Sequence, residues 1–197
     1  NIYKLRLIRS FLFLTLLCTF TSMCGIAGIL SINSKQVSTH RLKQMTDALA
    51  HRGPDGEGVW VNENKTVALG HRRLSILDLS EAASQPFHFT SPFYKGNGEN
   101  PRYTIIHNGE IYNYIELREE LIKKGYSFRS SSDTEVITAA YDCYKEDCLH
   151  LFDGMFSFAI WDEQEQQLFA ARDRFGEKPF FYFADEKQFL FASELKA

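Results

Sequence analysis

The spacing of hydrophobic residues divides the chain into helical and extended segments. Apolar side chains recur three and four positions apart over residues 39–50, 114–124 and 134–145, which predicts three amphipathic helices. Short apolar or alternating runs bounded by turn residues predict strands. These runs cover residues 25–32, 58–61, 67–71, 74–79, 103–107, 155–161, 168–172, 179–183 and 188–192. Two sheets flanked by helices are the natural packing of such elements, so one α+β domain is expected.

Two further local patterns bear on the packing. Residues 85–102 are polar and rich in Gly and Pro, which predicts a long surface loop. In the second helix the predicted inner face consists of Ile115, Leu117, Leu121 and Ile122.

The composition supplies enough aromatic residues for a sizeable core, and the spacing of Cys and His argues against a metal site. Seventeen Phe and nine Tyr are available to fill the core. The four cysteines, Cys18, Cys24, Cys143 and Cys148, have neither a zinc-type spacing nor a redox CxxC pair, and the His residues lack the i, i+4 pairing of a zinc helix. We therefore predict no metal site, and we expect Cys143 and Cys148 to be buried thiols near the end of one helix.

The first 22 residues have a different character from the rest. Basic residues precede an apolar run at residues 11–20, which is the layout of a secretory signal. The apolar run is too short to cross a bilayer. Met23 fits a signal cleavage site poorly, so we favour the alternative that residues 1–22 are translated upstream sequence and Met23 is the initiator. This segment holds no acidic residue, so the remainder is more acidic than the formal charge of −3 for the whole chain, and nothing suggests a nucleic-acid partner.

Cys24 follows Met23 directly and stands at the start of a small-residue strand. Removal of Met23 would make Cys24 a terminal residue that carries both a thiol nucleophile and a potential base, its own α-amine. Such an amine titrates at about pH 7.7–8.0, so part of it can take the thiol proton at neutral pH. This chemistry requires that the chain does not continue upstream.

Two segments could supply groups that bind or polarise a substrate. Arg72 and Arg73 stand at the entry of an apolar strand, where a guanidinium can grip a carboxylate through two hydrogen bonds. The alternative is a solvated strand end. Asn108 and Gly109 follow a predicted strand, and an Asn amide with a Gly N–H can face a developing oxyanion. Asn-Gly is also ordinary turn chemistry.

A third segment opens the last predicted helix. Ser132 or Asp133 occupies a capping position there. Alternatively, the Asp133 carboxylate points at a bound ammonium group, which requires that Asp133 and Glu110 converge. An arginine, two carboxylates, a thiol and an oxyanion hole would together suit an α-amino acid with a reactive side-chain carbonyl.

The ordered motifs of the chain resemble those of a known family. They are MCGIAGI, HRGPDGEG, GHRRLSILDLS followed by QP, HNGEIYNY, SDTE, GMFSFAIWD, ARDRFGEKPFFY and FASELKA. Together they look like the glutaminase domain of glutamine-hydrolysing asparagine synthetase, a class II glutamine amidotransferase, and the resemblance covers residues 23–197. It implies a four-layer αββα sandwich of the N-terminal-nucleophile hydrolase type.

The resemblance also implies catalytic roles. Cys24 would attack the side-chain amide of L-glutamine and form a glutamyl thioester after ammonia leaves. Asn108 and Gly109 would form the oxyanion hole.

Substrate-binding roles are implied in the same way. Arg73 would bind the α-carboxylate of glutamine, and Glu110 and Asp133 would hold its α-amino group. Ile76 and its neighbours would line the substrate slot.

The resemblance further implies a division of labour between two domains. Glutamine hydrolysis needs no cofactor, whereas a C-terminal synthetase domain would use ATP and Mg to amidate aspartate with the ammonia. The sequence contains no Ser-Gly-Gly-Leu-Asp-Ser type nucleotide loop, so we expect that domain to be absent from residues 1–197. We also expect residues 172–179 to face it and, with the aromatics of residues 180–183, to be exposed without it.

Several expectations about the wider setting and several rival functions accompany this interpretation. A cytoplasmic protein is expected, without a membrane or nucleic-acid partner, and a homodimer is possible. The rivals are the glutaminase half of another amidotransferase branch, an amidotransferase of the same group with a different acceptor, and a non-catalytic domain in which the leader is retained.

Overall fold

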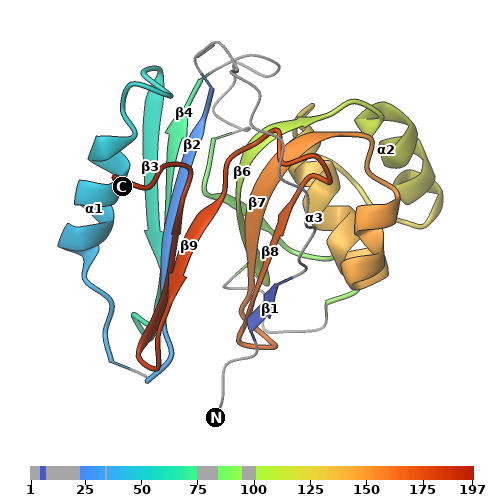
Figure 1. Ribbon diagram of the computed structural model, residues 1–197. Helices are drawn as coiled ribbons and strands as arrows, with labels where there is room; N and C mark the ends of the chain where they lie inside the picture. The colour runs from blue at the N-terminus through green and yellow to red at the C-terminus, as the bar shows by residue number, and fades with distance from the viewer. Residues whose placement is uncertain (1–4, 8–22, 34, 75–83, 95–100) are drawn as a thin grey trace.

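Two five-stranded sheets stack face to face in the computed structural model, which describes residues 5–7, 23–33, 35–74, 84–94 and 101–197 (Figure 1). In the first sheet the order is β3 (Gly56–Val61), β4 (Val67–Arg73), β2 (Gly25–Ser31), β10 (Gln188–Ala192) and β9 (Phe181–Ala184). In the second it is β1 (Leu5–Leu7), β8 (Gln167–Arg172), β7 (Gly154–Asp162), β6 (Tyr103–Ile111) and β5 (Phe87–Phe89). Among these strands only β1 and β8 pair in parallel.

Helices cover the outer face of each sheet. The helix α1 (Thr39–Ala48) packs on the first sheet, and α2 (Tyr114–Lys123), α3 (Asp133–Tyr144) and the short 3₁₀ helix η2 (Lys145–His150) lie beyond the second. The protein is therefore an αββα sandwich, as the sequence predicts. None of the helices in the described residues is long and apolar enough to cross a membrane.

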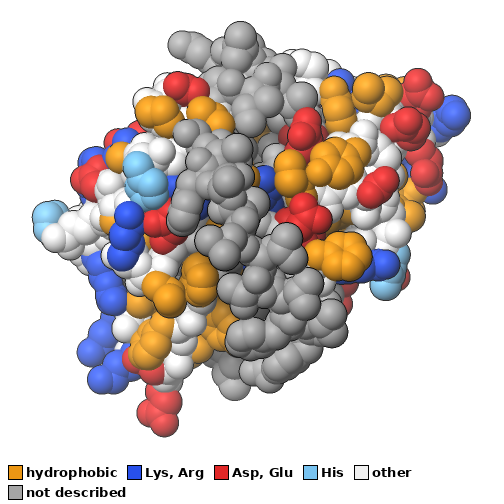
Figure 2. Space-filling model, turned by 45° about the horizontal axis from the view of Figure 1, so that its top comes forward, with side chains coloured by type: hydrophobic (Ala, Val, Ile, Leu, Met, Phe, Trp, Pro, Cys, Tyr) orange, Lys and Arg blue, Asp and Glu red, His pale blue; other side chains and the backbone are white. Residues whose placement is uncertain are grey.

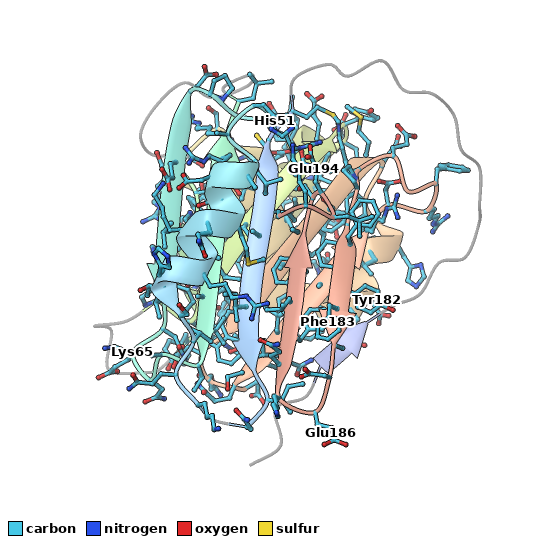
Figure 3. All side chains as sticks on the ribbon, turned by 60° about the vertical axis from the view of Figure 1, so that its left-hand side comes forward. His51, Lys65, Tyr182, Phe183, Glu186 and Glu194 are labelled. Atoms are coloured by element: carbon cyan, nitrogen blue, oxygen red, sulfur yellow. The ribbon has the colours of Figure 1, made fainter. Side chains whose placement is uncertain are left out.

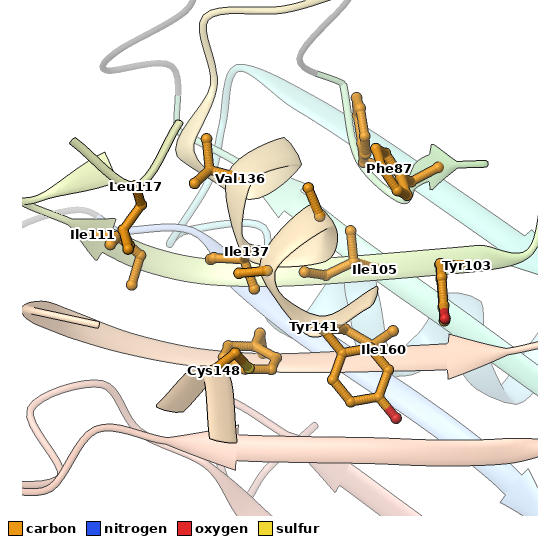
Figure 4. Packing of buried hydrophobic residues seen from close by; sticks show 14 of the residues in the cluster. Phe87, Tyr103, Ile105, Ile111, Leu117, Val136, Ile137, Tyr141, Cys148 and Ile160 are labelled. Atoms are coloured by element: carbon orange, nitrogen blue, oxygen red, sulfur yellow. The ribbon is translucent and has the colours of Figure 1, made fainter. Parts of the chain in front are cut away.

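Strand periodicity separates three layers of apolar packing. Along β6, Ile106 points between the sheets, where it packs with Trp161, whereas Ile105 points toward α3, where it packs with Tyr141 (Figure 4). A third cluster joins α1 to the first sheet. Each large side chain buried in this way contributes roughly 1.5–3 kcal/mol to stability. Because β7 is covered on both faces, its sequence is nearly continuous in apolar residues rather than alternating.

The second sheet extends further than the sequence predicts. Residues 87–89 form β5 within the predicted surface loop, where they pair with β6. Strand β6 continues through Ile111, so Asn108 and Gly109 lie within a strand and not after one. The ladder continues because glycine allows the close approach of β6 and β7 at their ends. A Cβ atom built on Gly154 would lie 2.2 Å from the carbonyl oxygen of Glu110.

Two predictions about helical side chains are partly wrong. Leu117 and Leu121 are buried, but Ile115 and Ile122 are 55% and 53% exposed. Side chains four residues apart lie on one face of a helix, and α2 packs through the face that carries Leu117 and Leu121. Cys148 is buried on η2, whereas Cys143 is half-buried on α3.

The break between α3 and η2 separates the two thiols. It occurs at Lys145, whose φ of 52° ends α3. The strand predicted at residues 74–79 lies outside the described residues except for Leu74, which follows β4.

Candidate active site

Cys24 lies at the end of the first sheet that is uppermost in Figure 1, directly before β2. The backbone N–H of Leu74 donates to Cys24 Sγ at 3.3 Å, because Gly25 pairs with Arg72 at the end of β4. Burial raises the pKa of the Cys24 thiol, although the Leu74 N–H and the positive charges of Arg73 and Lys178 act in the opposite direction. The thiol is therefore protonated at neutral pH and needs a base before it can attack a carbonyl.

Arg52 holds the backbone of Cys24 from the other side. Its Nε donates to the Cys24 carbonyl oxygen at 3.1 Å, and its Nη1 binds Glu194 Oε1 at 3.1 Å. Figure 3 shows Glu194 beside His51, whose Nε2 is 2.8 Å from the same carboxylate oxygen. Gly53 lets this loop approach β4, since a Cβ atom there would lie 2.4 Å from the Arg72 carbonyl oxygen.

Asn108 and Gly109 come from the other sheet. The Asn108 side chain is buried, and its Nδ2 has no hydrogen-bond partner among the described residues. Gly109 has a φ of +149°, and a Cβ atom there would lie 2.1 Å from the Met155 carbonyl oxygen, so no other residue fits without a backbone shift. An amide donor without an acceptor beside an obligatory glycine is an arrangement that could receive an external oxygen atom.

Among the described residues, a hydrogen bond of His71 connects the two sheets near the candidate residues. Nε2 of His71 on β4 lies 3.1 Å from the carbonyl oxygen of His107 on β6. This contact lies two residues before Arg73 on one sheet and one residue before Asn108 on the other. It thus brings the strand that contacts Cys24 to the strand that carries the amide donor.

The two histidines are poor proton acceptors. Burial lowers the pKa of His71 to about 3. Burial also lowers the pKa of His107, with Lys178 acting in the same direction and Asp133 opposing it. Neither imidazole can therefore accept a thiol proton effectively near pH 7.

Polar atoms without partners are concentrated in this region. Six buried side-chain nitrogen or oxygen atoms lack a hydrogen-bond partner within the described part of the chain. Five of them belong to residues of the two facing strand ends and the Arg52 loop: Arg52 Nη2, His71 Nδ1, His107 Nε2, Asn108 Nδ2 and Ser157 Oγ. Ser157 is the cross-strand neighbour of Asn108. Such atoms are costly to bury, so their concentration marks a candidate binding site.

Asp133 binds the backbone near the end of β6, the strand that carries Glu110. Asp133 Oδ2 accepts a hydrogen bond from the N–H of Ile111 at 3.0 Å, which places Asp133 beside the residue that follows Glu110. Ser132 is the helix cap, since its Oγ accepts from the N–H of Thr134 at 3.1 Å, so Asp133 is free of the capping role. Whether the Glu110 and Asp133 carboxylates converge stays a prediction. Ile76 lies outside the described residues.

Charged side chains lie on both sides of the undescribed residues at this end of the molecule. Figure 2 shows Lys and Arg side chains as well as Asp and Glu side chains there. Charges of both signs suit a zwitterionic ligand.

Residues 172–179 are less exposed than expected. Phe175 and Phe181 are exposed, as are Tyr182 and Phe183 (Figure 3). Asp173 and Lys178 are buried, and the ring of Phe180 stacks on that of Phe191 with 5.0 Å between the ring centroids. Sequence reasoning missed the burial of Lys178 because a charged turn is usually solvated. It also missed Arg52, although the HRGPDG motif contains it.

Comparison with solved structures identifies the class of fold. The glutamine phosphoribosylpyrophosphate amidotransferase from B. subtilis superposes with a TM-score of 0.70 over 87% of this chain and 42% of that chain, at 22% sequence identity. The two chains thus share the αββα fold.

Comparison of sequences shows the family. The sequence model of the glutamine amidotransferase domain matches residues 23–197, and the chain belongs to this family. Asparagine synthetase [glutamine-hydrolyzing] 3 of Bacillus subtilis is 46% identical over 176 residues, which cover 89% of this chain and 27% of that protein. Putative asparagine synthetase [glutamine-hydrolyzing] 2 of Methanocaldococcus jannaschii is 41% identical over 181 residues, which cover 88% of this chain and 34% of that protein. The chain therefore spans about a third or less of these relatives.

Proposed function

We propose that this domain hydrolyses L-glutamine to glutamate and ammonia when its chain begins at Cys24. The observation that carries the proposal is an unpartnered amide donor, Asn108 Nδ2, on a strand that the His71–His107 contact joins to the strand beside the Cys24 thiol. His71 and His107 are too weakly basic to activate the thiol. A terminal α-amine at Cys24 supplies the missing base within the same residue.

The proposed reaction has two stages. The α-amine takes the thiol proton, and the Cys24 sulfur attacks the side-chain carbonyl carbon of glutamine. Asn108 and the Gly109 N–H stabilise the resulting oxyanion. The intermediate then expels ammonia with a proton from the α-ammonium, which leaves a glutamyl thioester. Water attacks this thioester with the α-amine as base, and glutamate leaves as the thiol re-forms.

Substrate binding follows from the charges of the site. Arg73 would bind the α-carboxylate of glutamine, with Ile76 lining the slot. Glu110 and Asp133 would bind the α-ammonium group from the end of β6. This proposal is supported by the Asp133–Ile111 contact, which places Asp133 beside the backbone of the residue that follows Glu110.

We further propose that the ammonia serves amide synthesis in a C-terminal synthetase domain of a longer chain, with aspartate as acceptor and ATP with Mg as activating reagents. The relatives named asparagine synthetase support this proposal, since their matched parts are about a third of their length or less. The glutaminase stage itself needs no cofactor. Processing at Met23 would take place in the cytoplasm.

The test compares two proteins. One is translated from Met23 and shown by mass spectrometry to begin at Cys24, and the other retains residues 1–22. We expect release of glutamate and ammonia only from the first, because only it has a free α-amine. Equal rates from both proteins would overturn the role of the amine.

The choice of acceptor needs a separate test. A longer chain that includes the downstream domain is assayed for amide formation with ATP, glutamine and either aspartate or other carboxylic acids. Formation of asparagine supports aspartate as acceptor. Amidation of a different acid would favour an amidotransferase of the same group with another acceptor.

A further inference from the structure

Lys178 is a buried lysine whose ammonium group points at the chain just before Cys24. The side chain belongs to the turn between β8 and β9, and the residue is only 4% exposed. Its Nζ contacts Met23 Sδ at 2.6 Å. Among the described residues no carboxylate lies within ion-pair distance of Nζ, which is unusual for a buried lysine.

The turn fixes this orientation. Asp173 is buried, and its carboxylate accepts hydrogen bonds from the backbone N–H groups of Phe175 at 3.1 Å, Glu177 at 2.9 Å and Lys178 at 3.0 Å. The Asp173 carboxylate is therefore used to shape the turn. The inward orientation of Lys178 therefore follows from the hydrogen-bonded turn and not from a salt bridge among the described residues.

Several charged groups surround this ammonium. Burial lowers the pKa of Lys178, and the positive charge of Arg52 acts in the same direction, while Glu177, Asp173 and Cys24 oppose them. In return Lys178 favours the thiolate form of Cys24, as does Arg73, and lowers the pKa of His107. Lys178 therefore acts electrostatically on Cys24.

Removal of Met23 changes what this lysine faces. The Met23 side chain and its peptide link disappear, and the Cys24 nitrogen becomes a free amine. A cation held beside a second amine disfavours protonation of that amine, by the same physics that lets a neighbouring cation depress a catalytic lysine.

We propose that Lys178 is a positioning residue that lowers the proton affinity of the Cys24 α-amine and thiol, so that the amine is a free base at neutral pH. This inference rests on the proposed function, because it concerns the terminal amine. Lys178 does not touch the reacting carbonyl, and it exchanges no proton in the cycle. In general, a unit positive charge about 6 Å from an amine, at an effective dielectric constant of about 40, lowers the pKa of that amine by about 1.

The experiment compares protein that begins at Cys24 with its Lys178→Met and Lys178→Arg variants. Two pH profiles are recorded for each: kcat/KM for glutamine hydrolysis, and the rate at which iodoacetamide alkylates Cys24 without glutamine. We expect Lys178→Met to move the acid-side midpoint of both profiles upward by about one pH unit, with about tenfold lower values well below the midpoint. Lys178→Arg keeps the charge and should keep the midpoint.

Lys187→Met is the matched control. Lys187 is exposed in the turn between β9 and β10, at the opposite end of the sheet, so its removal should leave both midpoints unchanged. If Lys178→Met does not fold, Lys178→Gln replaces it, and thermal melting establishes which variant is folded.

The outcomes separate this inference from the proposed function. Unshifted midpoints in a folded neutral variant, or a lower rate at every pH without a shift, would overturn the inference and leave glutamine hydrolysis intact. A shifted alkylation profile in protein that does not hydrolyse glutamine would support the inference and overturn the proposed function.

Discussion

Two clusters of buried polar groups occupy the sandwich, and they differ in how completely their atoms are paired. The first, at the Cys24 end, contains Asn108 and His71 and includes several atoms without partners among the described residues. The second, the Asp142 cluster, lies between α3, β5 and β6. There the carboxylate of Asp142 accepts hydrogen bonds from Ser91 Oγ, Tyr103 OH at 2.8 Å and Tyr126 OH at 2.7 Å.

The rest of the Asp142 cluster is equally well paired. Lys145 Nζ donates to Tyr103 OH at 2.8 Å, and the Arg102 guanidinium binds Asp162 while lying 3.8 Å from Asp142. Burial raises the pKa of Tyr103 and of Tyr126 above the usual range, so both hydroxyls remain donors.

The comparison separates buried polar groups that are paired within the fold from those that another molecule could complete. A fully satisfied network makes a unique packing rigid, whereas unpaired buried donors cost stability and persist where another molecule completes them. We therefore expect substitutions in the two clusters to have opposite signatures, one on activity and the other on stability.

Substitution at the nucleophile should have the largest effect. Cys24→Ala in protein processed at Met23 should lower kcat for glutamine hydrolysis by more than about 10⁴-fold, since no other described thiol faces the site. Cys148→Ala is the matched control, because burial raises the pKa of that thiol to about 12 and it should be inert. Ammonia release is the measurement, and residual activity in Cys24→Ala would place the nucleophile elsewhere.

Loss of the unpaired amide should come next. Asn108→Ala removes a donor needed most when the oxyanion forms, so kcat should fall by about 10²–10³-fold with little change in KM. Arg73→Ala should instead mainly raise KM, because it binds ground state and transition state alike. Steady-state kinetics distinguish the two, and a normal kcat in Asn108→Ala would remove that residue from the oxyanion hole.

Substitution in the paired cluster should act on stability. Asp142→Ala leaves buried hydroxyls without their acceptor, so the free energy of unfolding should fall by about 3 kcal/mol. Denaturant unfolding measures this change. Below the unfolding transition kcat should stay within about twofold of the parent, and a selective loss of kcat would contradict the separation of the two clusters.

The last expected effect concerns the dependence of stability on pH. His71 has a folded pKa of about 3, below the value of about 6.5 for the unfolded chain. Above pH 6.5 both states are neutral, and as the pH falls from 6.5 toward 3 the unfolded state takes up the proton first. The free energy of unfolding should therefore decrease by about 1.4 kcal/mol per pH unit in that window.

The matching variant is His71→Gln. Its stability should depend less steeply on pH over the same window, as followed by chemical denaturation at several pH values. An unchanged slope in this variant would show that His71 is accessible to protons in the folded state.

The sequence predicts the helices and most strands because their periodicity is local. Leu117 and Leu121 show a four-residue stripe that any helix would bury. Cys24 and the Asn108–Gly109 pair can also be selected from the sequence as candidates, since each has chemistry of its own and the ordered motifs resemble a known family.

Other features depend on packing between distant segments. The contact between His71 and His107 joins residues 36 positions apart, and no periodicity indicates it. Lys178 is buried in a turn whose backbone binds the Asp173 carboxylate. Strand β5 forms where a polar segment meets the edge of β6, which a composition rich in Gly and Pro conceals.

The division of the site between two sheets has a mechanical consequence. The proposed nucleophile moves with one sheet and the proposed oxyanion donors move with the other, so the distance between sulfur and amide is set by how the two layers slide past each other. The hydrogen bond between His71 and the His107 carbonyl oxygen opposes such sliding, because it joins the two sheets. Pressure, heat or a partner domain that shifts one layer would then change the reaction rate without altering any residue that touches the substrate.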